Sequence, residues 1–377
     1  MIDRKLRLGL LSFWLSRNGA GVFEAVVVQA LAMRDSGMIE PHVFGLADDR
    51  SDTDAARFEG IPVQTFSVKG PPVFGFAPGL LVAIKAAEID VLHLHGIWMY
   101  PSLVAERWAA ATGKPVVISP HGMLDPWILS RGRWKKAIAR ALYEKRSWKR
   151  AALFHALTEA EAADIRTAEP SAKVTIIANG VQPPEGQSPA PRTKFVFLSR
   201  IHPKKNVIAL VKAWAALGTL PAERGFSLDI AGFGEADHVA ALEQAIRSAN
   251  SPTIRFIGSV FGEEKAQLLL SARYLVLPSL SEGLPMAILE AWAAGAPTIM
   301  SKDCNLPVGF ERGVAIDCGH DASSIAEALR KAMQPDEPAW SGVSSGARAL
   351  AKERFSPDAI SHAWVDTYAA LAARGAR

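Results

Sequence analysis

The chain has 377 residues, of which 49% are hydrophobic and 21% are charged. This length suits two domains, each able to bury its own core, and the composition excludes disordered and fibrous proteins. The net charge is only +4, and the two cysteines, Cys304 and Cys318, match no metal-site spacing. Few cysteines in so long a chain favour a reducing compartment over a disulfide framework.

The first apolar segment, residues 7–13, is interpreted as a strand. It could imitate a signal peptide, but Arg7 and Arg17 interrupt the apolar region and no small-residue cleavage site follows. No apolar run in the chain approaches the roughly 18 residues of a membrane span. We therefore expect a cytoplasmic protein.

A glycine loop follows this strand. After Asn18-Gly19-Ala20-Gly21, apolar residues recur at helical spacing from Val22 to Leu31. A strand, a glycine loop and a helix in this order direct backbone N–H groups at a phosphate or a sugar. Gly19 and Gly21 are therefore candidate contacts, although the loop lacks the full dinucleotide-binding fingerprint.

Residues 42–47, 63–68, 91–95 and 115–119 are the next predicted strands. Asp52-Thr53-Asp54 has the D-x-D spacing by which some sugar transferases hold Mg²⁺ or Mn²⁺, but it lies in a polar turn and not at the end of an apolar strand. The sequence therefore disfavours a metal site there. His121 leaves the carboxyl end of the last of these strands, where α/β sheets bind ligands, but a lone histidine can also be purely structural.

Residues 131–150 concentrate the basic charge. They hold nine Lys or Arg and one acid, Glu144, a balance of 9 − 1 = +8. Near one helical stripe lie Trp134, Ala137, Ile138, Ala141, Leu142 and Trp148. Two interpretations stay open: a helix packed by its tryptophans with a solvated basic face, or a helix docked on an anionic membrane surface. No nucleic-acid module accompanies the patch, so nucleic acid is not an expected partner.

Residues 182–193 form a Pro-rich polar linker after Asn179-Gly180-Val181. We predict an N-terminal domain over 1–185, a C-terminal domain over 186–355 and a last helix over 356–377. Predicted strands at 174–178, 195–198, 227–231, 254–257 and 274–277 alternate with helical segments. The predicted fold is thus α/β, with a doubly wound parallel sheet in each domain.

The second domain carries the main candidate site. Arg200 and Lys205 straddle a turn between a strand and a helix, so two cations converge on one anion. Glu282 stands between a strand and the mouth of a helix that begins near Pro285, and Glu290 lies roughly 7 to 8 Å beyond Pro285 at about 1.5 Å per residue. Carboxylates so spaced can hold two parts of one hydroxyl-rich ligand, while the helix N-terminus suits a diphosphate. The alternative is a capping acid and a solvated glutamate.

Several motifs resemble one family. Residues 281–299, SEGLPMAILEAWAAGAPTI, resemble the E-x7-E signature of the retaining glycosyltransferases of family 4. The strings PHGMLDPW and HALTEAE are similar to the bacterial exopolysaccharide and lipopolysaccharide branch of that family. Ser199-Arg200 and Lys205-Asn206 match its Arg and Lys motif, with Ser199 in place of a glycine, and Gly19-Ala20-Gly21 replaces two consecutive glycines. The resemblance implies the GT-B fold, two Rossmann-like domains facing across a cleft, with the last helix crossing back to the first domain.

The resemblance also implies residue roles. Glu290 would hold a ribose diol, Glu282 would bind sugar hydroxyls, and His121 would contact the donor sugar. The donor phosphates and their surroundings would involve Arg200, Lys205, the Gly283 and Leu284 backbone, Gly19, Gly21, Gly232 and Gly234.

The implied reaction is retaining, metal-independent transfer from a nucleotide-diphosphate sugar to a glycan or lipid-linked glycan in bacterial cell-surface polysaccharide synthesis. No cofactor beyond the donor substrate is expected. The enzyme would work in the cytoplasm, with residues 131–150 at the inner face of the membrane. A nucleotide-sugar epimerase or a phosphorylase of the same fold, or a non-catalytic sugar-nucleotide-binding partner, remains the alternative.

Overall fold

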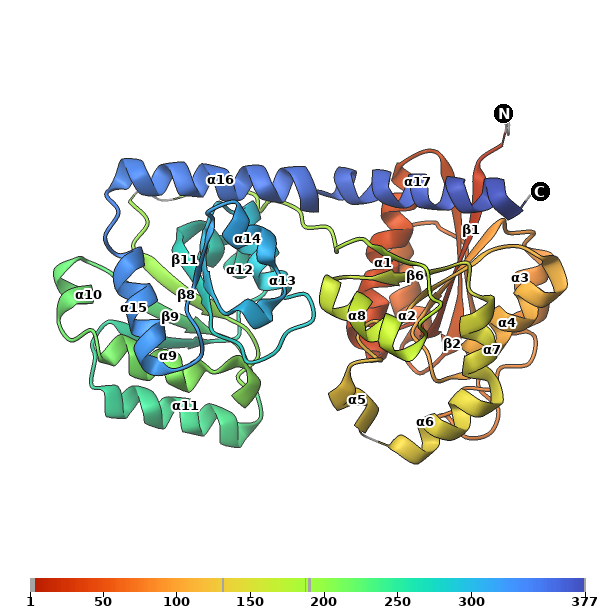
Figure 1. Cartoon of the computed structure of the whole chain (residues 1–377), viewed down its shortest axis with the longest axis horizontal. Coiled ribbons are helices and arrows are strands. Elements are labelled where there is room, and N and C mark those ends of the chain that lie inside the picture. The colour runs from red at the N-terminus through yellow and green to blue at the C-terminus, as the bar shows by residue number, and fades with distance from the viewer. Residues whose placement is uncertain (1–3, 131, 187, 189–190, 376–377) are drawn as a thin grey trace. The chain divides into compact units, whose positions relative to one another are not determined.

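A computed structural model describes residues 4–130, 132–186, 188 and 191–375 of the chain. The chain divides into two compact units (Figure 1). Unit 1 comprises Met1–Asn179 and Pro357–Arg377, and unit 2 comprises Gly180–Ser356. The chain leaves unit 1 slightly before the predicted break after residue 185, and its last helix, α17 (Pro357–Gly375), belongs to unit 1.

Unit 1 is built on a seven-stranded parallel sheet of order β3-β2-β1-β4-β5-β6-β7. Its strands are β1 (Leu6–Trp14), β2 (Ile39–Ala47), β3 (Val63–Ser67), β4 (Val91–His95), β5 (Val116–Ser119), β6 (Leu153–Ala156) and β7 (Val174–Ile176). The central strands β1 and β4 are apolar over most of their length because helices cover both faces of a parallel sheet. Leu8, Leu10 and Leu94 are accordingly fully buried.

Unit 2 repeats the plan with a six-stranded parallel sheet of order β10-β9-β8-β11-β12-β13. Its strands are β8 (Lys194–Leu198), β9 (Ser227–Ala231), β10 (Ile254–Gly258), β11 (Ala272–Leu277), β12 (Thr298–Met300) and β13 (Ala315–Asp317). The strand order turns outward in both directions from β8 and β11, so the carboxyl ends of these two strands flank the switch point of the sheet. Ligands of open α/β sheets bind at such a point.

The helices connect the strands on both faces of each sheet. Those of unit 1 are α1 (Ala20–Asp35), α2 (Ser51–Asp54), α3 (Leu80–Ala86), α4 (Tyr100–Thr112), α5 (Pro126–Ser130), α6 (Arg133–Ala139), α7 (Lys145–Arg150), α8 (Glu159–Ala168) and α17. Those of unit 2 are α9 (Val207–Ala215), α10 (Leu220–Glu223), α11 (Ala236–Ala249), α12 (Gly262–Ser271), α13 (Met286–Ala293), α14 (Pro307–Glu311), α15 (Ala322–Ala332) and α16 (Glu337–Phe355).

The predicted α/β fold with two doubly wound parallel sheets is confirmed. Every strand predicted from an apolar run is present, within a few residues of its expected ends. The strands β6, β12 and β13 were not predicted as strands. Each has only three or four residues and lies toward the outside of its sheet, so it carries too little periodic pattern to be recognised.

A chain of buried polar groups ties α17 to the sheet of unit 1. It runs from Gln29 through Tyr368, His93, Ser119 and His155 to the Ile177 carbonyl, with successive distances of 2.6, 2.6, 2.6, 2.7 and 2.7 Å. Because His155 Nε2 donates to a carbonyl, its Nδ1 must accept from the Ser119 hydroxyl. Ser119 in turn accepts from His93 Nε2, His93 Nδ1 accepts from the Tyr368 hydroxyl, and Tyr368 accepts from the Gln29 amide. Burial lowers the pKa of His155 to about 4 and that of His93 well below its usual value, so both rings are neutral.

The basic segment is not one continuous α-helix. A π-helix, Arg140–Glu144, separates α6 from α7. A π-turn is wider than an α-turn, so the residues on its two sides do not share one stripe. Trp148 is buried, whereas Trp134, Ile138 and Leu142 are 66%, 50% and 65% exposed. The interpretation that the tryptophans of this segment pack into the domain therefore holds for Trp148 and is wrong for Trp134.

Candidate functional site

The turn that carries Arg200 is fixed by two glycines of the neighbouring loop. Ser199 N–H donates to Ala231 and Ile201 N–H donates to Phe233, at 3.2 and 2.7 Å. An added Cβ at Gly232 would lie 1.9 Å from the Ser199 carbonyl oxygen, and one at Gly234 would lie 2.2 Å from that of Ile201. Gly232 and Gly234, which the sequence suggested as ligand contacts, are thus required for close backbone packing beneath the exposed Arg200.

The structure brings Lys205 and Glu282 together. Lys205, at the end of a short 3-10 helix (Pro203–Lys205), places Nζ 2.6 and 2.5 Å from the two carboxylate oxygens of Glu282. The Ser279 hydroxyl donates to the same carboxylate at 2.6 Å. The Lys205 and Glu282 side chains are 15% and 7% exposed, so the pair is largely shielded from water.

The loop around Glu282 is held by residues that the sequence gave no reason to select. Glu282 N–H donates to the Asp303 carbonyl at 3.0 Å, and the Asn305 side-chain amide donates to the Glu282 carbonyl at 2.6 Å. Leu280 N–H bonds to the carbonyl of Lys204. The carboxylate is therefore presented by a loop that is bound on both sides, which favours a preorganised site.

Glu290 lies on α13, which begins directly after Pro285 as its N-cap. Its carboxylate accepts from Lys265 Nζ at 2.7 Å. An added Cβ at Gly283 would meet no atom within 4 Å, so the space beside that backbone is open, next to half-buried Leu284. Lys265, on α12, is a candidate site residue that the sequence analysis missed; only its place opposite Glu290 reveals it.

In unit 1, His121 follows β5 in a left-handed backbone conformation with φ +54°, which is uncommon for a residue other than glycine. His121 Nε2 lies 3.0 Å from His95 Nδ1, which belongs to the end of β4. Burial, with His155 nearby, lowers the pKa of His121 to about 3. The imidazole is therefore neutral at physiological pH and can share a single proton with His95.

A buried carboxylate fixes the backbone next to His121. Glu161, near the start of α8, accepts from Gly122 N–H at 2.7 Å and from Leu157 N–H at 2.8 Å. Thr158 caps the same helix by accepting from Glu161 N–H. Glu161 thus links the loops after β5 and β6, and its bond to Gly122 stabilises the strained backbone conformation of the adjacent His121.

The glycine loop of unit 1 rests on the acidic turn at 48–54. Asp54 accepts from the Arg17 backbone N–H and from its guanidinium, the shortest contact being 2.6 Å, and this holds the pKa of Asp54 down at about 2. Asp48 accepts from the Ser16 hydroxyl at 2.6 Å. Gly19 is needed because an added Cβ would lie 2.5 Å from the Trp14 carbonyl, whereas Gly21 borders open space.

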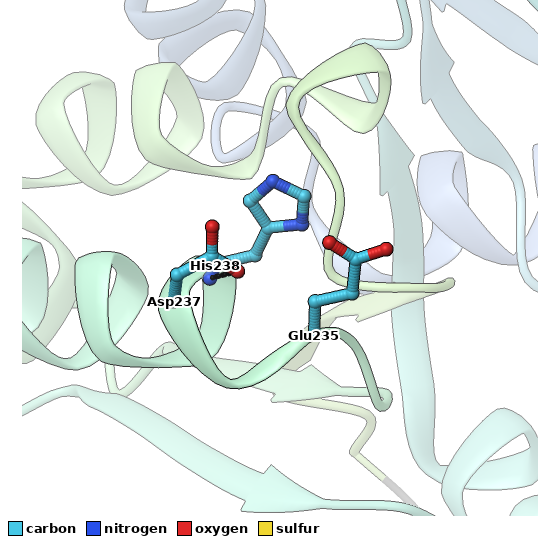
Figure 2. A group of neighbouring side chains, drawn as sticks. All are labelled: Glu235, Asp237 and His238. Carbon is cyan, nitrogen blue, oxygen red and sulfur yellow. Dashed lines mark hydrogen bonds between the residues drawn. The ribbon is translucent and has the colours of Figure 1, made fainter.

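The D-x-D spacing therefore serves a structural pair, because Arg17 occupies the Asp54 carboxylate while Asp52 is exposed. Among the described residues, one group brings three possible metal ligands together, at the start of α11: Glu235, Asp237 and His238, whose ligand atoms lie within 4.8 Å of one another (Figure 2). The Asp237 carboxylate already accepts from the His238 backbone N–H at 2.8 Å. We assign no metal to this group, and metal independence stays a prediction.

The polar groups described above occupy the carboxyl ends of the central strands of each sheet. In unit 2 the strand ends carry Arg200, the Lys205–Glu282 pair and Glu290 paired with Lys265. In unit 1 they carry the glycine loop and His121 with His95. The ligand roles of these residues stay predictions.

Each half of the chain matches a known family. Residues 20–180 match the family described as glycosyl transferase 4-like domain, and residues 192–335 match the family described as glycosyl transferases group 1. D-inositol 3-phosphate glycosyltransferase of Streptomyces avermitilis is 28% identical over 348 residues, which span 84% of this chain and 73% of the relative.

Two further relatives match shorter stretches. GDP-mannose:cellobiosyl-diphosphopolyprenol alpha-mannosyltransferase of Xanthomonas oryzae pv. oryzae is 29% identical and covers 64% of this chain and 63% of its own length. O-antigen chain mannosyltransferase B of Escherichia coli is 26% identical, covering 47% of this chain and 45% of its own.

Solved structures show the same fold at lower sequence identity. The UDP complex of Anabaena Alr3699/HepE superposes with a TM-score of 0.75 at 20% identity, over 96% of this chain and 100% of that one. The lipopolysaccharide outer core galactosyltransferase WaaB superposes with a TM-score of 0.70 at 15% identity, over 97% and 99%.

Proposed function

Because the chain is a glycosyltransferase of the GT-B fold, with a 4-like domain followed by a group 1 domain, we propose that it is a retaining enzyme. It would transfer a sugar from a nucleotide-diphosphate donor to a hydroxyl of a glycan or lipid-linked glycan. Relatives named for O-antigen and for diphosphopolyprenol acceptors support a place in bacterial cell-surface polysaccharide synthesis. The observation that carries the proposal is the shielded Lys205–Glu282 pair beside Arg200.

A donor diphosphate would compete with Glu282 for Lys205. Its negative charge is larger than that of one carboxylate, and Arg200 on the neighbouring turn can bind it as well. When Lys205 turns to the diphosphate, the oxygens of Glu282 can accept hydrogen bonds from the sugar hydroxyls. In this proposal Lys205 exchanges Glu282 for the diphosphate, so the Glu282 carboxylate becomes available to the sugar only when the diphosphate is bound.

The same cations act on the chemical step. The bond between the anomeric carbon and the diphosphate oxygen breaks, the acceptor oxygen bonds to that carbon on the same face, and the acceptor proton passes to the departing phosphate. Negative charge grows on the leaving group, where Arg200 and Lys205 can stabilise it in a partly shielded site. Two cations so placed make a divalent metal unnecessary in this proposal.

Glu290 and His121 complete the assignment. Glu290 would accept the two ribose hydroxyls, with Lys265 free to move to a phosphate or to the base once the ribose takes its place. His121 would bond a donor-sugar hydroxyl as a neutral imidazole, since its lowered pKa excludes the charged form near pH 7. His95 fixes the orientation of that ring.

We also propose that residues 131–150 dock on an anionic membrane surface. Trp134, Ile138 and Leu142 are exposed apolar side chains in a segment rich in basic residues, each worth about 1 kcal/mol near such a surface. No helix among the described residues has the length and apolarity to cross a bilayer. Co-sedimentation with liposomes should rise with anionic lipid content and fall when Lys135, Lys145 and Lys149 are neutralised; a response to neither would refute docking.

The donor site is tested by thermal unfolding with UDP, GDP, ADP and their common sugar derivatives in EDTA. A ligand that binds the folded state raises the melting temperature by mass action. We expect one nucleotide to stabilise the wild type and the shift to be lost in Glu290→Ala and Arg200→Ala. Glu243→Ala, an exposed acid on α11, serves as the matched control and should shift like the wild type. Equal shifts in all four proteins would refute the site.

A further inference from the structure

Unit 1 contains an apolar pocket of about 560 Å³ beside α6. Its walls come from the ends of neighbouring strands: Phe13 and Trp14 from β1, Trp98 and Met99 after β4, and Met123 after β5. The volume lies in the range of pockets that bury small organic ligands. Aromatic and thioether side chains of this kind recognise a flexible apolar group.

The charge around the pocket is one-sided. Among its described lining residues only Lys135 and Lys136 are ionisable, and both lie on the first turns of α6. An apolar cavity bordered by two lysines complements an amphiphile in which an apolar chain is joined to a phosphate or diphosphate. Lys136 Nζ donates to the Ile128 carbonyl, a contact that a more highly charged phosphate can replace. It does not complement a sugar alone, whose hydroxyls would meet apolar walls.

The pocket wall is held in a strained conformation. Trp98 has φ +78°, in the left-handed region that favours glycine. The backbone N–H of Trp98 donates to the buried Glu144 carboxylate at 2.5 Å, and the backbone carbonyl of Trp98 accepts from the Tyr143 hydroxyl at 2.8 Å. Both partners belong to the π-helix, a feature frequent at functional sites. Strain that is supported from two sides indicates a preorganised binding wall.

The pocket shares two loops with the candidate site of unit 1. Met123 lies two residues after His121, and Trp98 lies three residues after His95, to which His121 bonds. The indole N–H of Trp98 donates to the Met123 carbonyl at 3.4 Å, which joins the two segments. A ligand seated in the pocket would therefore lie on the same two strand ends as His121.

We propose that this pocket binds the phosphate-proximal part of the apolar chain of a lipid-linked acceptor, with Lys135 and Lys136 on the phosphate or diphosphate. The inference rests on the proposed function, since it places the acceptor of that reaction. The exposed side chains of Trp134, Ile138 and Leu142 belong to the same helical segment, so a chain leaving the pocket could enter the bilayer beside this segment.

Binding of farnesyl diphosphate to the full chain, measured by isothermal titration calorimetry, tests the proposal. We expect farnesyl diphosphate to bind at least about tenfold more tightly than farnesol or inorganic diphosphate. Farnesol can contact only the apolar walls, and inorganic diphosphate can contact only the lysines. Ala139→Phe, which fills the pocket from α6, should abolish binding. Val73→Asp places a carboxylate at an exposed rim residue, where folding is undisturbed, and should weaken binding about tenfold.

The matched control concerns charge. Lys135→Ala with Lys136→Ala should weaken farnesyl diphosphate binding about tenfold or more, whereas Lys145→Ala with Lys149→Ala, which removes the same charge from α7 outside the pocket, should leave it unchanged. Equal losses in both double variants would mean general attraction to the basic segment and would overturn the proposal. Unchanged binding in both Ala139→Phe and Val73→Asp would also overturn it.

Two further arms separate the alternatives. Dihexanoyl phosphatidylglycerol that binds as tightly as farnesyl diphosphate would assign the pocket to membrane phospholipid and overturn the acceptor assignment. The nucleotide-dependent melting shift is measured on every variant and should persist, because the nucleotide site lies in unit 2. A wild type that binds farnesyl diphosphate but no nucleotide would refute the proposed function and leave the pocket standing.

Discussion

In unit 2 both glutamates of the candidate site are joined to lysines by ion pairs, whereas the histidines around His121 in unit 1 are neutral and are joined to their neighbours by hydrogen bonds. Lys205 holds Glu282 and Lys265 holds Glu290. His121 meets His95, and the neighbouring His93 and His155 share Ser119. An ion pair can be exchanged for a charged ligand, but a buried neutral network has no such competitor. The difference suggests that unit 2 responds to the donor while unit 1 is preorganised.

The largest expected effect is on activity. Glu282→Ala should lower the rate of sugar transfer about 10² to 10³-fold, as for other preorganised polar groups at a reacting centre. Lys205 would still bind the diphosphate in this variant, so the nucleotide affinity should change less than the transfer rate. Transfer rate and nucleotide affinity are measured together, with Glu243→Ala as control. A variant that keeps more than half of the wild-type rate would remove Glu282 from the site.

Gly232→Ala should lower the free energy of unfolding of unit 2 by about 2 to 4 kcal/mol. The added methyl would overlap the Ser199 carbonyl, and φ at this residue is +154°. Gly342→Ala on α16 is the matched control: its Cβ would meet nothing within 4 Å, and we expect a stabilisation of about 0.5 to 1 kcal/mol. Chemical unfolding of both variants decides the question, and a neutral Gly232→Ala would refute the close-packing explanation.

Tyr368→Phe should cost unit 1 about 1 kcal/mol, because it removes the hydroxyl that accepts from Gln29 and donates to Nδ1 of His93. The Gln29 amide nitrogen, 3.4 Å from that Nδ1, is then its remaining donor. Thr367→Ala removes a hydroxyl from the adjacent position of α17, where it bonds only one turn back to the Ala363 carbonyl among the described residues, and should cost less. Amide hydrogen exchange in unit 1 peptides measures both. Equal protection in the two variants would contradict an energetic role for the buried chain.

The last prediction concerns the effect of pH on unit 1. An unfolded histidine titrates near pH 6.5, whereas folded His155 titrates near 4. Between these values the unfolded chain binds more protons, so the free energy of unfolding falls as pH drops, by about 1.4 kcal/mol per pH unit for each such histidine. The contribution of the neutral His155 to the free energy of unfolding is fully present above pH 6.5. Unit 2, whose described histidines are at least partly exposed, should lose amide protection less; equal losses would contradict the comparison.

The sequence predicted what is local and left out what is tertiary. The two parallel sheets follow from apolar runs separated by helical segments, and Glu282, Glu290 and Arg200 could be selected because each lies at a strand end or helix mouth in a dense motif. Lys205 was selected for the diphosphate, but its contact with Glu282, 77 residues away, could not be foreseen.

The missed residues share one property. Lys265 and His95 lie in unremarkable local sequence, and their importance comes from Glu290 and His121, which they contact on another element. Glu161 lies in the string HALTEAE, but its contact with the Gly122 N–H, 39 residues away, could not be foreseen. The acidic turn at 48–54 teaches the reverse lesson, because Asp54, part of a spacing typical of metal sites, anchors Arg17. The π-helix in the basic segment depends on tertiary packing of Tyr143 and Glu144, which no periodicity records.

The most direct test of the account is the affinity of the preferred nucleoside diphosphate for the wild type, Lys205→Ala and Lys212→Ala, measured by calorimetry with EDTA and with Mg²⁺. Lys212 lies exposed on α9 and controls for the loss of one positive charge. The account predicts equal binding with and without Mg²⁺, at least about tenfold weaker binding in Lys205→Ala, and no change in Lys212→Ala. Binding that requires Mg²⁺, or that survives intact in Lys205→Ala, would contradict it.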